Sequence, residues 1–382
     1  MSRVRFLRSG VLACAMVSAA LVPSAAGSAA AGTTAGAHVA KAKWSPDAGV
    51  RAILVSHKRV YIAGDFTHLR NTSTGHRVTR DRVAAFNRTT GALVKRFHPN
   101  VNGEVRALAV LGHKLVIGGE FTTVDQKNRQ HLAAVNAGSG HLTHWKASVD
   151  GPVFALLSMR GDVYVGGDFE HADGQFRPHL FALDGQAVLS STWPDQAAGG
   201  TDHGVYTLAA SAGRHAVLVG GAFRTLAGSP RPFLGEIARG SGDVTAWAPA
   251  PLCSGPCFVN GLAVDDHFVY AGIAGPGGAA VAYRGDTAAT VWSKHTDGDV
   301  TGVALAGKRL VIGGHFTHVH KHPHPMFAEL VASSGKVTSR KPATTGTAFP
   351  GVLAVDVHDG RIRLGGDFQG IAGQRRYAIL PE

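Results

Sequence analysis

Short apolar runs alternate with glycine-rich and polar turns from about residue 43 to the end of the chain. Residues 105–110 and 153–157 are typical runs, and the turn Arg160-Gly161-Asp162 leads from the second of them into Val163-Tyr164-Val165. Short β-branched and aromatic segments with turn residues every ten or so positions indicate antiparallel sheet. No helical periodicity competes with this pattern, so we predict an all-β fold.

One tetrapeptide, Gly-Gly-acid-Phe or a near copy, recurs along the chain. Its second residue stands at positions 64, 119, 167, 221, 314 and 366, so the intervals are 48 to 55 residues except for one of 93. The long interval holds a degenerate copy at Val269-Tyr270-Ala271-Gly272, in which the acid and the Phe are lost. The chain therefore contains seven repeats.

Each repeat shows the same four predicted strands. The first is apolar, the second runs into the Gly-Gly-acid-Phe, and the third follows a polar loop, as at residues 83–86 and 132–135. A glycine turn then leads to a fourth strand that often carries an aromatic residue, such as Trp145 or Trp247. Four short strands repeated seven times are typical of a seven-bladed β-propeller, whereas an open solenoid would need caps that the sequence lacks.

The two ends of the repeat region predict how the ring closes. The last repeat stops after its third strand, at residues 377–380, and the first is preceded by Lys43-Trp44-Ser45-Pro46, which resembles His144-Trp145-Lys146-Ala147. We expect this N-terminal strand to complete the last blade and so remove its open edge. Residues 43–382 would then form one propeller domain.

The repeat Val-x-Ala-Leu … Gly-Gly-Asp-Phe-Thr … Arg … Leu-Ala resembles that of secreted bacterial propellers of the delta-sixty type, a domain of unknown function. The resemblance covers residues 44–382, and the repeat is also similar to that of a fungal cortical-landmark family. It implies the fold and a surface location but no chemistry. The hairpin at residues 83–91 also resembles that of quinoprotein propellers, but the cofactor-binding residues of that family cannot be placed, so we expect no cofactor.

The N-terminus has the features of an export signal. Arg3, Arg5 and Arg8 precede an apolar stretch at residues 11–22, and small residues follow at positions 24–26 and 29–31. We predict a signal peptide at residues 1–31, a flexible leader at 32–42, and a secreted, extracellular, monomeric product. The apolar stretch is too short for a membrane span, and no other segment could form one.

Two of the three cysteines belong to the mature region. Cys14 lies in the signal, early in its apolar run, which disfavours lipid modification. Cys253 and Cys257 stand in Cys-Ser-Gly-Pro-Cys, and in an oxidising compartment a pair this close is expected to form a local disulfide bond. A zinc site would need two further ligands, and a redox motif would have two intervening residues rather than three.

The formal net charge is +12, from 38 Lys and Arg against 26 Asp and Glu. This excess favours anionic partners, such as an acidic polysaccharide, a cell-wall polymer or nucleic acid, although a general surface bias with no specific ligand fits equally well. Of these partners, we do not expect nucleic acid.

One position in the first strand varies between the repeats, while the residues beside it stay apolar or small. Variation near the mouth of the channel is what a ligand-binding face would show, and also what an unconstrained strand end would show. The residues at this position are predicted to be Arg51, Arg106, Phe154, Tyr206, Asn260, Thr301 and Pro350.

The acid after Gly-Gly recurs together with an Arg before the third strand. Asp65 with Arg80, Glu120 with Arg129, and Asp168 with Arg177 are the three sets. We expect structural ion pairs that bracket each loop. The alternative is an anion-binding ring, which Arg231, standing opposite Ala222 without an acid, would favour.

The sixth repeat replaces the acid and the Arg by histidines. The histidines of this loop are His315, His318, His320, His322 and His324. Imidazole is a ligand for Zn²⁺, Cu²⁺ or Ni²⁺, so the loop is a candidate metal site, although alternating His and Pro is more typical of a solvated loop.

No catalytic motif is present, neither a nucleophile elbow, a zinc-protease His-Glu pair nor a phosphate loop. The sequence therefore favours a secreted binding protein for a glycan, cell-wall polymer or protein. We expect the ligand on the face that carries the loops after Gly-Gly-acid-Phe, at residues 67–81, 122–130, 170–178, 224–232 and 317–325. An extracellular polysaccharide hydrolase or lyase, and a structural surface protein, remain as alternatives.

Overall fold

A computed structural model describes residues 41–191, 193, 198–199, 204–251, 253 and 257–382. The predicted signal peptide at residues 1–31, and all of the leader except residues 41 and 42, lie outside these described residues. The regular secondary structure of the described residues is β-strand, apart from one short 3₁₀ helix at Ala212–Arg214. These residues contain no helix that is both long and apolar enough to span a membrane.

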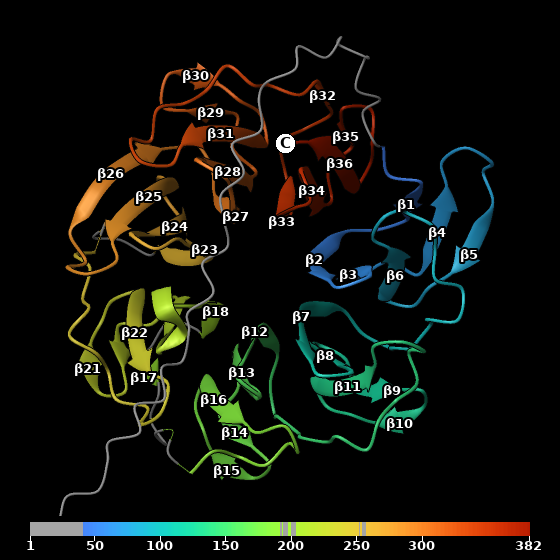
Figure 1. Cartoon of the computed structure of the whole chain (residues 1–382), viewed down its shortest axis with the longest axis horizontal. Helices are drawn as coiled ribbons and strands as arrows, with labels where there is room; N and C mark the ends of the chain where they lie inside the picture. The colour runs from blue at the N-terminus through green and yellow to red at the C-terminus, as the bar shows by residue number, and fades with distance from the viewer. Residues whose placement is uncertain (1–40, 192, 194–197, 200–203, 252, 254–256) are drawn as a thin grey trace, which may run out of the picture. The chain divides into compact units, whose positions relative to one another are not determined.

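The described residues form seven larger antiparallel sheets, each from one repeat (Figure 1). Their first strands are β2 (Val50–Ser56), β7 (Val105–Leu111), β12 (Val153–Met159), β18 (Val205–Ala210), β23 (Phe258–Val264), β27 (Val300–Ala306) and β33 (Val352–His358). Their second strands are β3 (Arg59–Gly64), β8 (Lys114–Gly119), β13 (Asp162–Gly167), β19 (Ala216–Gly221), β24 (Phe268–Ala274), β28 (Arg309–Gly314) and β34 (Arg361–Gly366). Their third strands are β6 (Val83–Asn87), β11 (Leu132–Asn136), β16 (Leu180–Leu183), β22 (Leu234–Ala238), β25 (Ala279–Arg284), β31 (Phe327–Val331) and β36 (Tyr377–Pro381).

A full fourth strand, β26 (Thr290–His295), is seen in the fifth sheet. In five other sheets the predicted fourth strand is reduced to one bridge with the third strand, such as Leu93 with Phe86 and Leu142 with Val135. The first strand of each sheet packs against that of the next, and β33 also packs against β2. Figure 1 shows these seven strands nearest the middle of the fold.

In six of the seven repeats, all but the fifth, the polar loop carries short strands at the outside of the sheets (Figure 1). They are β4 (His68–Asn71) with β5 (Arg77–Thr79), β9 (Thr123–Val124) with β10 (Lys127–Asn128), β14 (His171–Ala172) with β15 (Gln175–Phe176), β20 (Thr225–Leu226) with β21 (Ser229–Pro230), β29 (His318–Val319) with β30 (His322–Pro323), and β35 (Gly370–Ile371). The segment that leads into each repeat pairs with the first of them, as Val149 does with Ala172. Such leading segments also include β17 (Ala198–Gly199), which pairs with β20, and β32 (Thr344–Thr345), which pairs with β35.

The strand predicted to complete the last sheet pairs elsewhere. β1 (Trp44–Pro46) pairs with β4 of the first repeat, as the other leading segments do in their own repeats. No strand of the described residues pairs with the outer edge of β36, and the side-chain amide of Gln374 binds backbone groups there. Its Nε2 donates to the carbonyl of Ile379 (3.0 Å), while its Oε1 accepts from the backbone N–H groups of Ile379 (3.1 Å) and Ala42 (2.6 Å). Because one side chain satisfies these groups, the closing strand is not needed there.

The first Gly of Gly-Gly-acid-Phe makes room for the next repeat. A Cβ added to Gly118 would lie 2.4 Å from Cγ1 of Val153, the leading valine of the third repeat. The same relation joins the last repeat to the first, since a Cβ on Gly365 would lie 2.6 Å from Cγ1 of Val50. Only hydrogen fits between sheets that approach so closely.

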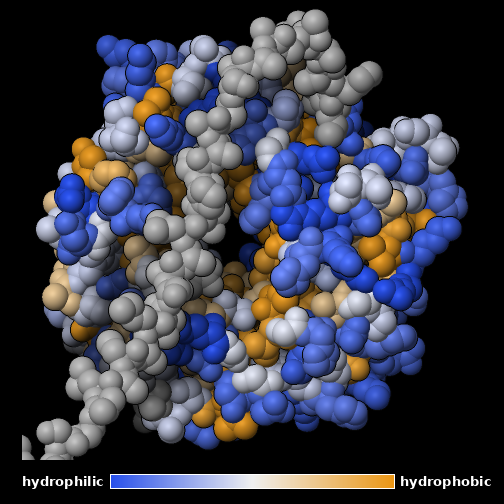
Figure 2. All heavy atoms as spheres, in the orientation of Figure 1, coloured by the Kyte–Doolittle hydropathy of each residue, from blue (hydrophilic) through white to orange (hydrophobic). Residues whose placement is uncertain are grey.

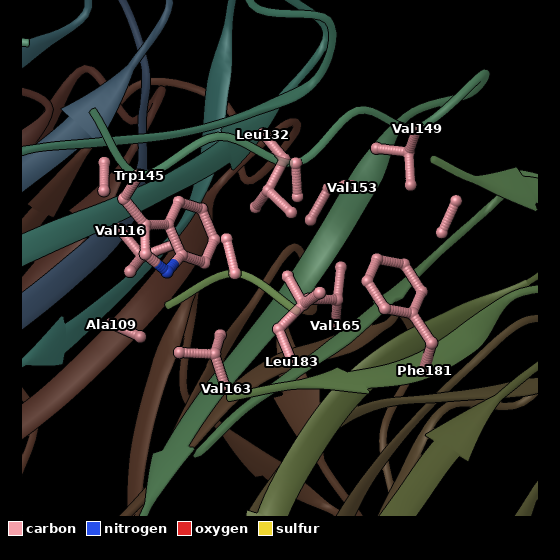
Figure 3. Packing of buried hydrophobic residues seen from close by; sticks show 14 of the residues in the cluster. Ala109, Val116, Leu132, Trp145, Val149, Val153, Val163, Val165, Phe181 and Leu183 are labelled. Atoms are coloured by element: carbon pink, nitrogen blue, oxygen red, sulfur yellow. The ribbon is translucent and has the colours of Figure 1, made fainter. Parts of the chain in front are cut away.

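Apolar clusters fill the spaces between neighbouring sheets. Figure 3 shows the one between the second and third sheets, where Leu132 and Trp145 lie with Val153, Val165 and Leu183. Another joins the last repeat to the first, with Tyr377 stacked on Phe86 at 5.9 Å between ring centroids. The core is therefore distributed between sheets, as expected for repeats that each bury only part of their apolar surface alone.

Candidate functional site

Every first strand carries a β-bulge at the same place. In the first repeat, Val50 lies opposite Gly64 but Ala52 lies opposite Ala63, so Arg51 has no partner on the second strand. The same shift of register occurs after the leading valine in all seven sheets. A bulge leaves one residue unpaired and redirects its side chain.

The seven bulged residues surround a single cavity of about 400 Å³. They are Arg51, Arg106, Phe154, Tyr206, Asn260, Thr301 and Leu353, and Phe258 completes the lining. Five of these were predicted as ligand-binding residues, and the structure brings those five together. Figure 2 shows the surface hollowed near the middle of the view, where the first strands converge in Figure 1.

The second Gly of the repeated motif makes this bulge possible. A Cβ on Gly119 would lie 2.1 Å from the carbonyl oxygen of Glu104, and one on Gly167 would lie 2.1 Å from that of Pro152. The acid that follows donates its backbone N–H to the same carbonyl, at 2.9 Å for both Glu120 and Asp168. The Gly-Gly-acid-Phe motif therefore stabilises the bulge, and the bulge positions the side chain that lines the cavity.

Three aromatic side chains form a continuous arc along the cavity. The ring centroids of Phe154 and Tyr206 are 5.4 Å apart, and those of Tyr206 and Phe258 are also 5.4 Å apart. The guanidinium of Arg106 lies 5.3 Å from the Phe154 centroid, which extends the arc by a cation–π contact. Burial raises the pKa of the Tyr206 hydroxyl, with Asp168 adding to the rise and Arg106 opposing it, so this group stays a neutral hydrogen-bonding group at physiological pH.

The two arginines of the cavity are balanced by carboxylates behind them. Glu104 lies 2.5 Å from Nε of Arg51 and 2.7 Å from Nη2 of Arg106, and Glu120 lies 2.8 Å from the same Nη2. The Glu104 side chain is 14% exposed. This network holds both guanidinium groups in place and cancels much of their charge.

Comparing the seven repeats along the sequence did not reveal Phe258 and Glu104, and it gave the wrong residue for the seventh repeat. Pro350 precedes β33, and the position is occupied by Leu353, because Gly351 lies in the turn (φ +73°) and Val352 is the leading valine. Glu104 and Phe258 share the position just before the leading valine, so comparing that position across the repeats would have found both.

The predicted pairs of acid and Arg do not form. In the first and fourth repeats the Arg before the third strand instead donates from Nη2 to a carbonyl of the outer segment, at 3.0 Å from Arg80 to Lys95 and 2.8 Å from Arg231 to Thr245. In the third repeat Nη2 of Arg177 donates to the side chain of Gln175 (3.2 Å). Arg231 also donates to its neighbour Pro230, and it does not line the cavity. The guanidinium of Arg231 therefore closes a loop, and the structure does not bring it together with the other residues predicted to bind a ligand.

The histidines of the sixth repeat do not assemble a metal centre. His318 lies 3.0 Å from Asp297, and His315 lies 3.5 Å from Asp299. His320, His322 and His324 occupy the same loop, but no three His, Cys, Asp or Glu side chains of the described residues come together as metal ligands.

The pairing of His318 belongs to a recurrent cap. The residue three places before the first strand accepts hydrogen bonds from two successive backbone N–H groups of the polar loop. In the first repeat Asp47 accepts from Thr67 (2.9 Å) and His68 (3.0 Å), and in the third Asp150 accepts from Glu170 and His171 (both 2.9 Å). The loops at residues 67–81, 122–130, 170–178 and 317–325 are thus bound to the leading segments, and the loop at 224–232 pairs with β17. None of the residues in these five loops lines the central cavity.

Cys253 and Cys257 lie at disulfide-bonding distance, with their Cα atoms 6.5 Å apart. They close a loop that leads into β23, the strand that carries Phe258 and Asn260.

No protein-family model and no curated protein matches this chain. Among solved structures, the crystal structure of the WD40 β-propeller domain of Doa1 covers 90% of this chain and 96% of its own at 14% identity, with a TM-score of 0.57. The crystal structure of the computationally designed Ika8 protein covers 88% of this chain and 98% of its own at 14% identity, with a TM-score of 0.53. The chain therefore has an all-β fold that resembles a β-propeller, while its similarity to the delta-sixty repeat type stays a prediction.

Proposed function

We propose that residues 43–382 form a seven-bladed β-propeller whose central cavity binds a carbohydrate chain of a glycan or cell-wall polymer. The observation that carries this proposal is the bulge in all seven first strands, which directs seven different side chains into one cavity. The contact of β33 with β2, and the packing of Gly365 against Val50, support closure of the ring.

The lining matches the chemistry of a sugar better than that of a simple anion. Sugar rings present apolar C–H faces that pack on aromatic rings, and the arc of Phe154, Tyr206 and Phe258 offers such surfaces in succession. Asn260 and the Tyr206 hydroxyl add hydrogen-bonding groups, in a cavity within the size range of ligand sites. Because Glu104 and Glu120 offset Arg51 and Arg106, we expect a neutral sugar to bind better than an acidic one.

Binding is favoured over hydrolysis by the same network. Glu104 and Glu120 both accept from Arg106, so neither carboxylate is a free base or acid. The expected signal peptide and the Cys253–Cys257 pair support action outside the cell.

The test is calorimetric titration of the purified protein with a panel of neutral and uronic-acid oligosaccharides, at low and high salt. We expect saturable binding of a neutral sugar with little salt dependence, weakened about tenfold by Tyr206→Ala, which corresponds to ~1.4 kcal/mol. The control is Phe176→Ala, since Phe176 is 50% exposed on β15 and lies outside the cavity. Absence of binding to every sugar, or equal affinity in Tyr206→Ala, would refute the proposal.

A further inference from the structure

A second cavity, here named the seam cavity, lies where the last repeat meets the first. Its volume is about 240 Å³. Val60, Phe86, Tyr377 and Ile379 contribute an apolar wall. The cations that line it are Lys41, Lys43, Arg88, Arg361 and Arg363, and none of the described Asp or Glu residues lines it.

The seam cavity exists because the last sheet lacks an outer strand among the described residues. In the first sheet the backbone N–H of Val94 donates to the carbonyl of Ala85 (2.9 Å), and in the second that of Thr143 donates to Ala134 (3.0 Å). In the last sheet the equivalent carbonyl, of Ile379, accepts from the Gln374 side chain instead. One amide satisfies the strand edge but fills less space than a strand, so a hollow is left beside it.

Arg363 lines this hollow and is 1% exposed. Its Nη1 donates to Asp356 (3.1 Å) and to the carbonyl of His358 (3.2 Å), and its guanidinium also hydrogen-bonds the Tyr377 hydroxyl in the cavity wall, but Nε has no acceptor among the described residues. Buried donors without acceptors are rare because leaving them unpaired is costly. An acceptor in the seam cavity would remove that cost.

The fold itself does not require an arginine here. The equivalent position of the second strand is Tyr or aliphatic in the other six repeats, namely Tyr61, Val116, Leu218, Val311, Tyr164 and Tyr270. A guanidinium keeps its positive charge when buried and presents a planar fork that matches carboxylate and phosphate groups. The seventh repeat thus has both a charged donor at this position and a cavity beside it.

Neither the neighbouring acids nor the chain's N-terminal residues supply a free carboxylate side chain to the seam cavity. Asp356 is shared between Arg363 and His358, and Asp359 is held by Arg88. Residues 1–46 contain no Asp or Glu, so the segment that precedes Lys41 cannot bring a carboxylate side chain to the site. An anionic group of a bound ligand would meet the guanidinium in the seam cavity.

We propose that the seam cavity binds a small ligand bearing a phosphate or carboxylate group, with Arg363 at the buried end and Lys43 at the exposed end. The apolar wall then contacts the body of the ligand. This site shares no lining residue with the central cavity, so failure of either proposal leaves the other standing.

The test is thermal unfolding of the full chain with increasing inorganic phosphate or glucuronate, against sodium chloride at equal ionic strength. We expect at least one of the two to raise Tm saturably beyond chloride, because a ligand that binds the folded state stabilises it. A rise with phosphate alone assigns a phosphoryl ligand, and a rise with glucuronate alone assigns a carboxylate. The rise should vanish in Arg363→Met and persist in Arg284→Met, a control at an exposed arginine paired with Asp286.

If Arg363→Met does not fold, Lys43→Gln decides the question. Loss of this cation should raise the ligand concentration for half the effect about tenfold, the change expected for one charge-assisted hydrogen bond. No rise beyond chloride in the unchanged protein, a full rise in Arg363→Met, or an unchanged half-effect concentration in Lys43→Gln would each overturn the proposal.

Discussion

Replacing Gly167 by Ala tests the link between the repeated motif and the bulge. The new Cβ would lie 2.1 Å from the carbonyl oxygen of Pro152 and 2.9 Å from two ring atoms of Phe169. Ordinary contacts of this kind are about 3.4 Å or longer, so the first strand would have to move by more than about 1 Å. Overpacking typically costs 1–3 kcal/mol, and because the clash is with backbone we expect about 3 kcal/mol, or a fall in Tm of about 6 °C.

Gly240→Ala is the matched control, because Gly240 lies in an exposed turn without positive φ and a Cβ there meets nothing within 4 Å. We expect this change to be neutral or slightly stabilising. Urea and thermal unfolding of the two variants give the comparison, and sugar binding should weaken in Gly167→Ala because Phe154 moves with the strand. A loss below about 1 kcal/mol for Gly167→Ala, or equal effects of the two changes, would refute the role assigned to the motif.

Three further predictions concern single side chains. Trp193→Phe should cost about 1 kcal/mol in urea unfolding because its Nε1 donates to a backbone carbonyl at 2.9 Å, whereas Trp145→Phe should cost less because that Nε1 has no partner. Burial raises the pKa of the Asp150 carboxyl, but hydrogen bonds from the backbone and side chain of His171 outweigh this and lower it below 3.8. Because the pKa of Asp150 is lower in the folded state than in the unfolded state, its carboxylate stabilises the fold above about pH 4, and this contribution is lost as the pH falls through the folded pKa. The Tm of Asp150→Asn should therefore fall less steeply with decreasing pH than that of the unchanged protein. Parallel curves of Tm against pH for the two proteins would contradict this prediction. Arg231→Met should lower Tm, because the change removes two hydrogen bonds to backbone carbonyls, and it should leave the affinity for sugar unchanged. Weaker sugar binding in this variant would indicate that Arg231 belongs to the ligand site.

The repeat and its strand order could be predicted because they are encoded locally. Alternating apolar residues and glycine turns specify strands wherever they occur, and a period of about fifty residues implies stacked sheets. The lining position could also be predicted, since Arg51, Arg106 and Phe154 vary where Val50 and its equivalents do not.

The remaining features depend on hydrogen bonds between residues that are distant in sequence. The bulge is a matter of register between two strands, which no residue type identifies alone. Arg80 was assigned to Asp65 by proximity in sequence, but its guanidinium reaches the carbonyl of Lys95 instead. The prediction of a fourth strand in the last sheet was wrong for the same reason. Nothing in the sequence distinguishes Gln374, whose side chain binds the edge of that sheet, from any other loop amide.

The packing of the last repeat against the first is the claim on which a cavity shared by seven repeats depends. A double-mutant cycle of Gly365→Ala and Val50→Ala, in urea unfolding, measures that packing directly. The added Cβ at Gly365 meets Cγ1 of Val50 at 2.6 Å, so removing that methyl should relieve the clash and give a coupling of about 1–2 kcal/mol. The cycle of Gly118→Ala with Val153→Ala, between adjacent repeats, should give a similar value. The contradicting result is that the losses in free energy of unfolding from Gly365→Ala and Val50→Ala simply add, while those from Gly118→Ala and Val153→Ala are coupled. That result would show that the ring is not closed in solution.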